Sequence, residues 1–243
     1  MPTSTVVLLH GVGLDHEMWE PVSSRLPQDM HVVAPDLLGH GANKPAETGT
    51  TLEDLAGDVL QNVDGPAHFV GFSLGALVAQ WIAIQRPDTV ATLTCVNSVC
   101  DRSEQERWAV MRRLRAAERD FAASVEASID RWYAGTGVAP DVVARTRATL
   151  LGNDLASYLA CYRVFATADE ALAPQLRRIH QPSLAITGEL DPGSTPDMTY
   201  RLASRMPGCT AVVVPDARHM LPVQLPDVFT RELVSFVKGT HHD

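Results

Sequence analysis

The chain has 243 residues, of which 45% are hydrophobic and 20% are charged, and its formal net charge is −9. This length is enough for one large α/β domain with a sizeable core, and the composition is ordinary for a soluble protein. The negative charge argues against nucleic acid and anionic membranes as partners, because both attract basic patches. No apolar run approaches the roughly 18 residues of a membrane span.

The N-terminal residues and the cysteines give expectations for the cellular location of the protein. Residues 1–5 carry no positive charge and the apolar run behind them covers only residues 6–9, so we expect no signal peptide. The four cysteines have no C-x-x-C spacing and stand at Cys95, Cys100, Cys161 and Cys209. We therefore expect free thiols, a cytoplasmic location and no metal site.

Six short apolar runs, rich in Val, Leu and Ile, alternate with segments of helical pattern. The predicted strands are residues 5–10, 31–35, 67–72, 91–97, 183–187 and 210–214. The predicted helices are residues 19–26, 52–63, 76–86, 196–206 and 227–237. Strands with little polar alternation are typical of a parallel sheet covered on both faces. The pattern predicts a doubly wound α/β fold with a parallel sheet of about six strands.

Residues 100–177 interrupt this alternation, because they contain no strand-like run. Apolar residues fall there at helical spacing, in stripes such as Trp108, Met111 and Leu114, or Phe121, Val125, Ile129 and Trp132. We expect three or four helices that form a cap, inserted into a core of residues 1–99 and 178–243. Such stripes are most often packing between helices, and we expect one or two of the aromatic rings to face a cleft.

The segment Gly71-Phe72-Ser73-Leu74-Gly75 is a G-x-S-x-G motif between a predicted strand and a predicted helix. In that setting the serine stands on a sharp turn with its hydroxyl clear of the sheet. A Cβ at either glycine would collide with the neighbouring strand or helix. The amides at the start of the helix point at any negative charge formed there. We therefore predict that Ser73 is a catalytic nucleophile.

A serine nucleophile needs a base and an acid that orients the base, and in this architecture the order along the chain is Ser, acid, His. Asp191 comes shortly after the fifth predicted strand, and His219 comes shortly after the sixth. Open α/β sheets place their sites at these carboxyl ends. We predict that Asp191 is the acid and His219 the base. The rival acids are Asp216, on the same loop as His219, and Glu189.

A glycine-rich turn, His10-Gly11-Val12-Gly13, follows the first predicted strand. Backbone N–H groups of such a turn bind the oxyanion that acyl transfer generates, and each donor contributes roughly 3 kcal/mol. The predicted oxyanion hole consists of the N–H groups of Val12 and Leu74. A dinucleotide-binding G-x-G-x-x-G does not fit, because Asp15 and His16 stand where the third glycine is needed. We therefore expect no cofactor.

With these motifs the chain resembles the α/β-hydrolase superfamily over nearly its whole length. The resemblance is carried by His10-Gly11, Asp36-x-x-Gly39-His40-Gly41, Gly71-x-Ser73-x-Gly75, Gly188-x-x-Asp191 and the His219 loop. The chain is most similar to 3-oxoadipate enol-lactonases, through Gln80-Trp81, Cys95-x-Asn97, Arg131-Trp132-Tyr133, Tyr158-x-x-Cys161-Tyr162 and Ala168-Asp169. In that family a tryptophan of the cap lines the substrate pocket, and the matching residue is Trp132.

The sequence departs from this family near its start. Relatives carry a β-hairpin before the first motif, whereas that motif begins here at residue 10. We therefore expect a sheet that lacks those two strands and has residues 31–35 at one edge. Because an uncovered edge strand invites pairing, we expect either a covering loop or a homodimer at this edge.

The resemblance implies a serine hydrolase that opens a small ester or lactone with water, and the enol-lactone of a dicarboxylic acid is the favoured substrate. A general carboxylesterase or a C–C bond hydrolase would use the same triad. A non-catalytic ligand-binding receptor of the same fold is a third alternative. An anionic substrate needs a cation in the pocket, and the predicted cap offers Arg112, Arg113, Arg115, Arg119, Arg131 and Arg163.

Overall fold

The structure, a computed structural model, describes residues 4–240. Its centre is a six-stranded sheet in the order β2-β1-β3-β4-β5-β6, in which every neighbouring pair is parallel. The strands are β1 (Ser4–Leu9), β2 (Met30–Val33), β3 (Ala67–Phe72), β4 (Val90–Val96), β5 (Ser183–Gly188) and β6 (Cys209–Val214). The prediction of six parallel strands, with the second at one edge, is confirmed.

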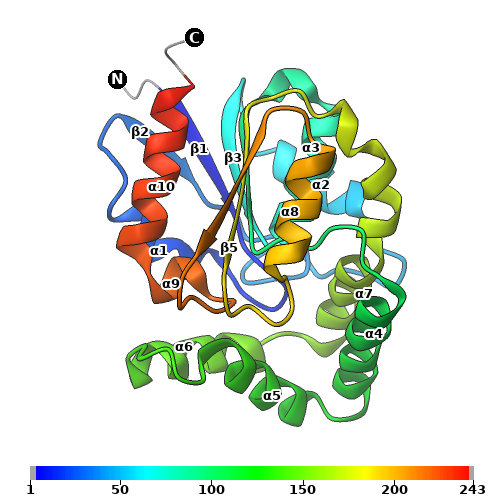
Figure 1. Cartoon of the computed structure of the whole chain (residues 1–243). Coiled ribbons are helices and arrows are strands. Elements are labelled where there is room, and N and C mark those ends of the chain that lie inside the picture. Colours follow the sequence, from blue (N-terminus) through cyan, green and yellow to red (C-terminus); the bar gives the residue numbers. More distant parts are fainter. Residues whose placement is uncertain (1–3, 241–243) are drawn as a thin grey trace.

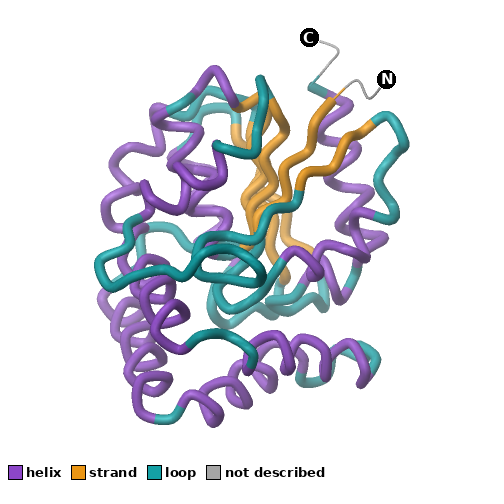
Figure 2. The backbone as a smooth tube through the Cα atoms, turned by 180° about the vertical axis from the view of Figure 1, so that it is seen from behind, coloured by secondary structure: helices purple, strands orange, loops and turns teal. Residues whose placement is uncertain are grey.

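Helices cover both faces of this sheet (Figures 1 and 2). One layer holds α1 (Glu20–Ser23), α9 (Leu221–Gln224) and α10 (Pro226–Gly239). The other holds α2 (Leu52–Leu60), α3 (Leu74–Gln85) and α8 (Pro196–Arg205). Short 3₁₀ turns connect elements at η1 (His16–Trp19), η2 (Pro87–Thr89) and η3 (Ala173–Arg178).

Two apolar cores lie on either side of the sheet, because successive strand side chains point to opposite faces. Val6 and Leu8 of β1 belong to the core that contains Trp19 and Phe229. Val7 and Leu9 belong to the other core, which includes residues of α2, α3 and α8. Burial on both faces explains why the strands appear in the sequence as continuous apolar runs.

The first predicted helix is shorter than expected. Instead of one helix over residues 19–26, the chain forms η1 and then a single helical turn, α1. The N–H of Leu26 donates to the carbonyl of Ser23, three residues earlier, at 3.3 Å, which is the pattern of a turn. Pro27 follows at once and has no N–H with which to continue a helix. The other predicted helices lie within three residues of the observed bounds.

Four helices separate β4 from β5, and they lie below the carboxyl ends of the strands in Figure 1. They are α4 (Glu104–Arg119), α5 (Phe121–Tyr133), α6 (Pro140–Leu151) and α7 (Leu155–Leu172). Ser103, Asp120 and Asp154 accept hydrogen bonds from first-turn N–H groups and so fix where α4, α5 and α7 begin. Residues 100–177, in which the sequence has no strand-like run, are therefore helical as expected. That these helices form a cap domain, separate from the core of residues 1–99 and 178–243, stays a prediction.

The expected packing of Trp108 is wrong. Its side chain is 60% exposed, and the guanidinium of Arg112 lies 4.8 Å from the centre of its ring. The buried residues of α4 are Val110, Leu114 and Ala117, which share one face of the helix. Trp108 lies off that face, although its spacing from Met111 suggested a common stripe.

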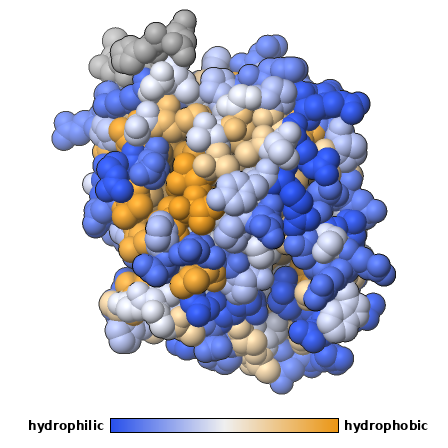
Figure 3. All heavy atoms as spheres, in the orientation of Figure 1, coloured by the Kyte–Doolittle hydropathy of each residue, from blue (hydrophilic) through white to orange (hydrophobic). Residues whose placement is uncertain are grey.

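The far edge of the sheet differs from its centre in exposure. β3 and β5 are fully buried, whereas the apolar residues of β6 are mostly half-buried. Hydrophobic side chains gather in this region, between α8 and α10 (Figure 3). The sheet therefore has a second edge strand with apolar character, at the opposite end from β2.

Two further observations concern the expectations on location. The four cysteines are free thiols. Within residues 4–240, no helix is both long enough and apolar enough to cross a membrane.

Candidate active site

Ser73 stands on the turn between β3 and α3 with φ 53° and ψ −108°. A positive φ is strained for a residue with a Cβ, and such strain persists only where neighbouring structure enforces it. A Cβ on Gly71 would lie 2.2 Å from the carbonyl oxygen of Gly75, and one on Gly75 would lie 2.3 Å from that of Leu9. The two glycines therefore allow the close approach of strand and helix that the turn requires.

The glycine-rich turn after β1 lies directly against this serine. The N–H of Gly75 donates to the carbonyl of His10 at 3.1 Å, and a Cβ on Gly11 would lie 3.3 Å from the Cβ of Ser73. Val12 and Ser73 line the same cavity. Leu74 follows Ser73 directly as the first residue of α3. The assignment of the Val12 and Leu74 N–H groups to an oxyanion hole stays a prediction.

His10 fixes the position of this turn, a role that the sequence did not indicate. Its Nε2 accepts the N–H of Leu37 at 2.9 Å, so its Nδ1 carries the proton and donates to the Gly11 carbonyl at 2.8 Å. Burial is the main cause that lowers the pKa of His10 to about 3, and the neighbouring His40 adds to the shift. A neutral imidazole thus holds the turn beside Ser73.

Asp191 and His219 are brought together from the loops after β5 and β6. The Nδ1 of His219 donates to Oδ2 of Asp191 at 2.6 Å, and the side chains are buried. The other carboxylate oxygen, Oδ1, accepts the N–H groups of Gly193 and Ser194 at 2.8 and 3.0 Å. Burial alone would raise the pKa of Asp191, but the charge of His219 and these hydrogen bonds outweigh it and lower that pKa.

Asn97 also binds this carboxylate, and sequence reasoning gave it no role. It follows β4 with φ 46°, and its Nδ2 donates to Oδ2 of Asp191 at 2.7 Å and to Oγ1 of Thr187 at 3.1 Å. The sequence signals were its place in the Cys95-x-Asn97 motif of the resemblance and an asparagine at the end of a predicted strand, a residue type that tolerates positive φ. Asn97 thus holds Asp191 in the orientation that faces His219.

The rival acids interact with each other's loops instead of with His219. The N–H of Asp216 donates to Oε2 of Glu189 at 3.3 Å, and the carbonyl of Asp216 accepts from Gln224 at 3.0 Å. Both acidic residues are exposed. Asp216 has φ 57°, as expected of a residue that shapes a turn.

A narrow cavity of about 50 Å³ contains Ser73, Asp191 and His219 in its lining. Trp132 of α5 also lines it, with its ring stacked on the imidazole of His219 at 5.4 Å between centroids. Tyr158, Tyr162 and Phe165 of α7 complete the aromatic side of the lining. Aromatic residues of the inserted helices therefore face the predicted catalytic residues.

Two of the six candidate arginines, Arg113 and Arg131, line this cavity. Arg131 donates to Oγ of Ser128 at 3.0 Å and to the carbonyl of Ala127 at 3.2 Å. Among the residues that the structure describes, neither arginine forms an ion pair. Burial, followed by the charge of Arg113, lowers the pKa of Arg131. An anion in this part of the cavity would find two cations without a carboxylate partner.

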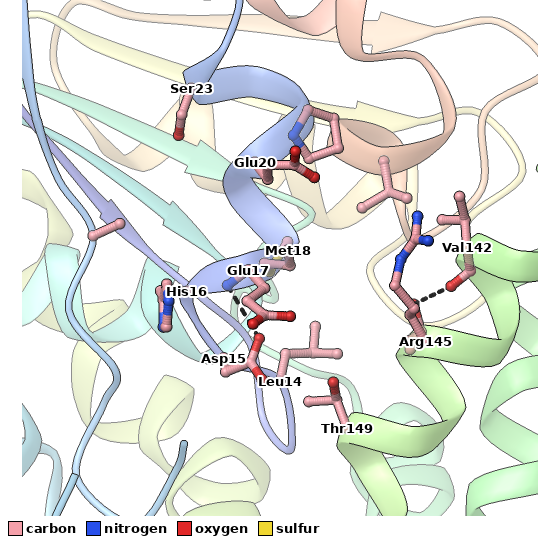
Figure 4. A pocket seen from close by; sticks show the side chains of 14 residues that line it. Leu14, Asp15, His16, Glu17, Met18, Glu20, Ser23, Val142, Arg145 and Thr149 are labelled. Atoms are coloured by element: carbon pink, nitrogen blue, oxygen red, sulfur yellow. Dashed lines mark hydrogen bonds between the residues drawn. The ribbon is translucent and has the colours of Figure 1, made fainter. Parts of the chain in front are cut away.

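A larger pocket of about 500 Å³ lies between α6 and the segment of η1 and α1 (Figure 4). Its lining carries the carboxylates of Asp15, Glu17 and Glu20 and includes none of the predicted catalytic residues. Leu14 lines both this pocket and the cavity at Ser73. The larger pocket is therefore a neighbour of the candidate site with an acidic lining.

Comparisons with known proteins identify the family of this chain. The family model described as "Alpha/beta hydrolase family" matches residues 6–232. The chain is 28% identical over 239 residues to the (E)-2-((N-methylformamido)methylene)succinate hydrolase of Acinetobacter baylyi, covering 97% of this chain and 90% of that protein. It is 30% identical over 241 residues to 3-oxoadipate enol-lactonase 1 of the same organism, covering 96% and 88%.

The crystal structure of the enol-lactonase from Burkholderia xenovorans LB400 matches with a TM-score of 0.88 and 28% identity, covering 97% of this chain and 91% of that chain. The fold class and the resemblance to enol-lactonases that the motifs predicted are thereby confirmed. The chain belongs to the alpha/beta hydrolase family, and it is a hydrolase of the esterase and lactonase type.

Proposed function

We propose that the protein cleaves a small ester or lactone by acyl transfer through Ser73, His219 and Asp191. One observation carries this proposal. A serine on a strained turn lines the same buried cavity as a histidine whose Nδ1 is bound to a buried carboxylate at 2.6 Å. In the neutral imidazole, this bond holds the proton on Nδ1 and leaves Nε2 as a base for the Ser73 hydroxyl.

In the first half of the reaction, Oγ of Ser73 attacks the substrate carbonyl and its proton passes to Nε2 of His219. The carbonyl oxygen becomes an oxyanion, which accepts hydrogen bonds from the N–H groups of Val12 and Leu74. The bond to the leaving oxygen then breaks, and His219 gives its proton to that oxygen. An acyl-enzyme on Ser73 remains; in a lactone, the leaving oxygen stays attached to the acyl chain.

In the second half, water attacks the acyl-enzyme and His219 takes a proton from it. The same oxyanion forms again and collapses, so that Ser73 leaves with the proton from His219 and the acid product is released. Asp191 keeps the imidazole in one tautomer throughout and stabilises its charged form. Val12 and Leu74 therefore stabilise the oxyanion, and Asp191 stabilises the imidazolium. Both charges are largest in the transition states.

The favoured substrate is an enol-lactone of a dicarboxylic acid. The similarity to enol-lactonases supports it, and so do the two unpaired arginines in the cavity lining, because the second carboxylate of such a substrate needs a cation. Trp132 would line the substrate pocket, within a cap formed by residues 100–177. A general carboxylesterase and a C–C bond hydrolase remain the alternative activities, since they would use the same groups.

Labelling with a fluorophosphonate tests the proposal, since this reagent reacts with an activated serine. We expect the wild-type protein to be labelled and Ser73→Ala to be neither labelled nor active. Labelling that persists in Ser73→Ala would overturn the assignment. A wild-type protein that takes no label but binds a lactone would favour the receptor alternative. A panel of enol-lactones, neutral esters and C–C substrates then separates the three hydrolase activities.

We also propose that the protein acts in the cytoplasm. The four free thiols support a reducing compartment, where disulfides rarely persist.

A further inference from the structure

A groove of about 250 Å³ lies between α4 and α5. One helix face forms each wall, with Arg113, Ala116 and Arg119 on α4 and Ser124, Ala127, Ser128 and Arg131 on α5. The spacing of three or four residues places each set along one side of its helix. Between the arginines the walls consist mainly of alanine and serine, which leave room for a carbon chain.

This groove leads into the candidate active site. Arg113, Ser128, Arg131 and Tyr162 line both the groove and the cavity that contains Ser73. Arg119 lines the groove alone, and six residues of helix place it about 9 Å from Arg113 along the helix axis. Arg113 and Arg131 therefore stand at the inner end of the groove, and Arg119 stands at its outer end.

The groove carries a strong positive charge on a protein whose net charge is −9. Among residues 4–240, Arg113, Arg119 and Arg131 form no ion pair. The one acidic residue in the groove lining, Asp120, caps α5 by accepting the N–H of Ala123 at 3.0 Å. Since the protein as a whole repels anions, a cluster of unpaired cations creates a local path along which an anion is attracted.

The acidic pocket of Figure 4 offers the opposite environment. It adjoins the cavity through Leu14, and it carries the carboxylates of Asp15, Glu17 and Glu20. Its arginine, Arg145, is already paired with Asp141 at 2.9 Å. These two neighbours of the catalytic cavity therefore differ in the sign of their charge, and of the two the α4–α5 groove is the one that attracts an anion.

We propose that the α4–α5 groove is the entrance for anionic substrates and that Arg113 and Arg131 bind the substrate's free carboxylate. Arg119 attracts the approaching anion at the outer end. This inference rests on the proposed hydrolase function and adds the charge of the substrate, its route and the residues that select it. The small residues of the walls accept the chain that joins the free carboxylate to the ester.

The test compares two esters that differ in one charge, 4-nitrophenyl hydrogen glutarate and the neutral 4-nitrophenyl valerate. The measured quantity is kcat/KM for the anionic ester divided by kcat/KM for the neutral one. We expect Arg113→Gln and Arg131→Gln to lower this ratio by about 10- to 100-fold, the scale of a lost charge-assisted hydrogen bond. We expect Arg119→Gln to lower it about two- to fivefold.

Two matched controls remove the same charge elsewhere. Arg115→Gln changes an exposed arginine of α4 that does not line the groove, and Arg145→Gln changes an arginine of the acidic pocket. Both should keep the wild-type ratio. In the wild type, added salt should lower kcat/KM for the anionic ester only, and this loss should be smaller in Arg119→Gln.

The inference is overturned if the ratio in Arg113→Gln and Arg119→Gln equals that in Arg115→Gln, or if Arg145→Gln alone lowers it. Failure of the proposed function gives a different result, namely no hydrolysis of either ester by the wild type. In that case calorimetry with glutarate still tests whether the groove binds a carboxylate. Binding at least tenfold weaker in Arg113→Gln than in the wild type supports the inference, and equal or absent binding contradicts it.

Discussion

The indole ring of Trp132 stacks on the imidazole ring of His219, with centroids 5.4 Å apart and planes inclined by 28°. The ring of Phe72 lies 4.9 Å from the same imidazole. The imidazole thus contacts a ring from α5 and a ring from the end of β3, while Asp191 binds its Nδ1. Because the face of an indole attracts a cation, this stacking would favour the imidazolium that the proposed mechanism forms at His219.

Replacement of Trp132 should therefore reduce turnover as well as substrate binding. We expect Trp132→Ala to lower kcat about 3- to 30-fold, corresponding to the loss of roughly 0.5–2 kcal/mol of cation–π attraction. Trp132→Phe retains an aromatic face and should lose less. The exposed Trp108 provides the control, since Trp108→Ala should leave kcat unchanged. If Trp132→Ala has the wild-type kcat and KM, this ring serves only in packing.

Asp191 should be the acid on which activity depends. Asp191→Asn removes the charge that stabilises the imidazolium and the acceptor that fixes its tautomer, so we expect kcat to fall by roughly 10³- to 10⁴-fold. Asp216→Asn and Glu189→Gln disturb only the exposed turn that these residues share and should stay near wild-type activity. Steady-state kinetics of the three variants shows which carboxylate orients His219. If Asp191→Asn is nearly as active as the wild type and either rival variant loses activity, the assignment of the acid is wrong.

The sheet and the loops that carry the candidate catalytic residues could be predicted from sequence because both depend on local patterns. Strands buried on both faces are continuous apolar runs, as in β3 and β5. The carboxyl ends of parallel strands meet at one edge of a sheet, which brings Ser73, Asp191 and His219 together from three loops. The strained turn at Ser73 follows from the two glycines that flank it.

The side of the site that α4, α5 and α7 form could not be predicted, since it depends on how these helices pack. Six arginines between residues 112 and 163 were candidates for binding an anion, and no spacing in the sequence shows which two of them line the cavity. The packing of α4 through Val110 and Leu114 leaves Arg113 beside the cavity and Trp108 in solvent. The role of Asn97 was missed for a related reason, because its partner Asp191 lies 94 residues away in the chain.

Asn97 should act as a positioning residue for Asp191. Its φ of 46° suits glycine better than alanine, so Asn97→Gly removes the amide with little backbone strain and Asn97→Ala adds about 1–2 kcal/mol. Loss of the 2.7 Å hydrogen bond raises the pKa of Asp191 and loosens its orientation. We expect both variants to lose about tenfold in kcat and the alanine variant to unfold at lower urea. Wild-type kcat in Asn97→Gly would exclude this role.

Two buried histidines near Ser73 should make the fold sensitive to mild acid. Burial is the main cause that lowers the pKa of His10 to about 3 and that of His40 to about 4, from an ordinary value of 6.5. Between these values the unfolded chain binds protons that the folded chain does not. Stability should therefore fall as the pH drops from about 6.5 towards 4, with no contribution from these groups above 6.5.

The measurement is the free energy of unfolding in urea at pH 7.5, 6 and 5. Carboxyl groups with lowered pKa values, such as Asp191, lose their contribution to stability only at a pH below this range. His16 acts in the opposite direction, because its hydrogen bond to Asp36 raises its pKa, so it offsets part of the loss. His40→Phe keeps a ring beside His10 and removes one titrating group, and it should reduce the loss between pH 7.5 and 5 by about 2 kcal/mol. The exposed His31→Gln is the control and should retain the wild-type pH dependence, and a His40→Phe variant that also retains it would contradict the prediction.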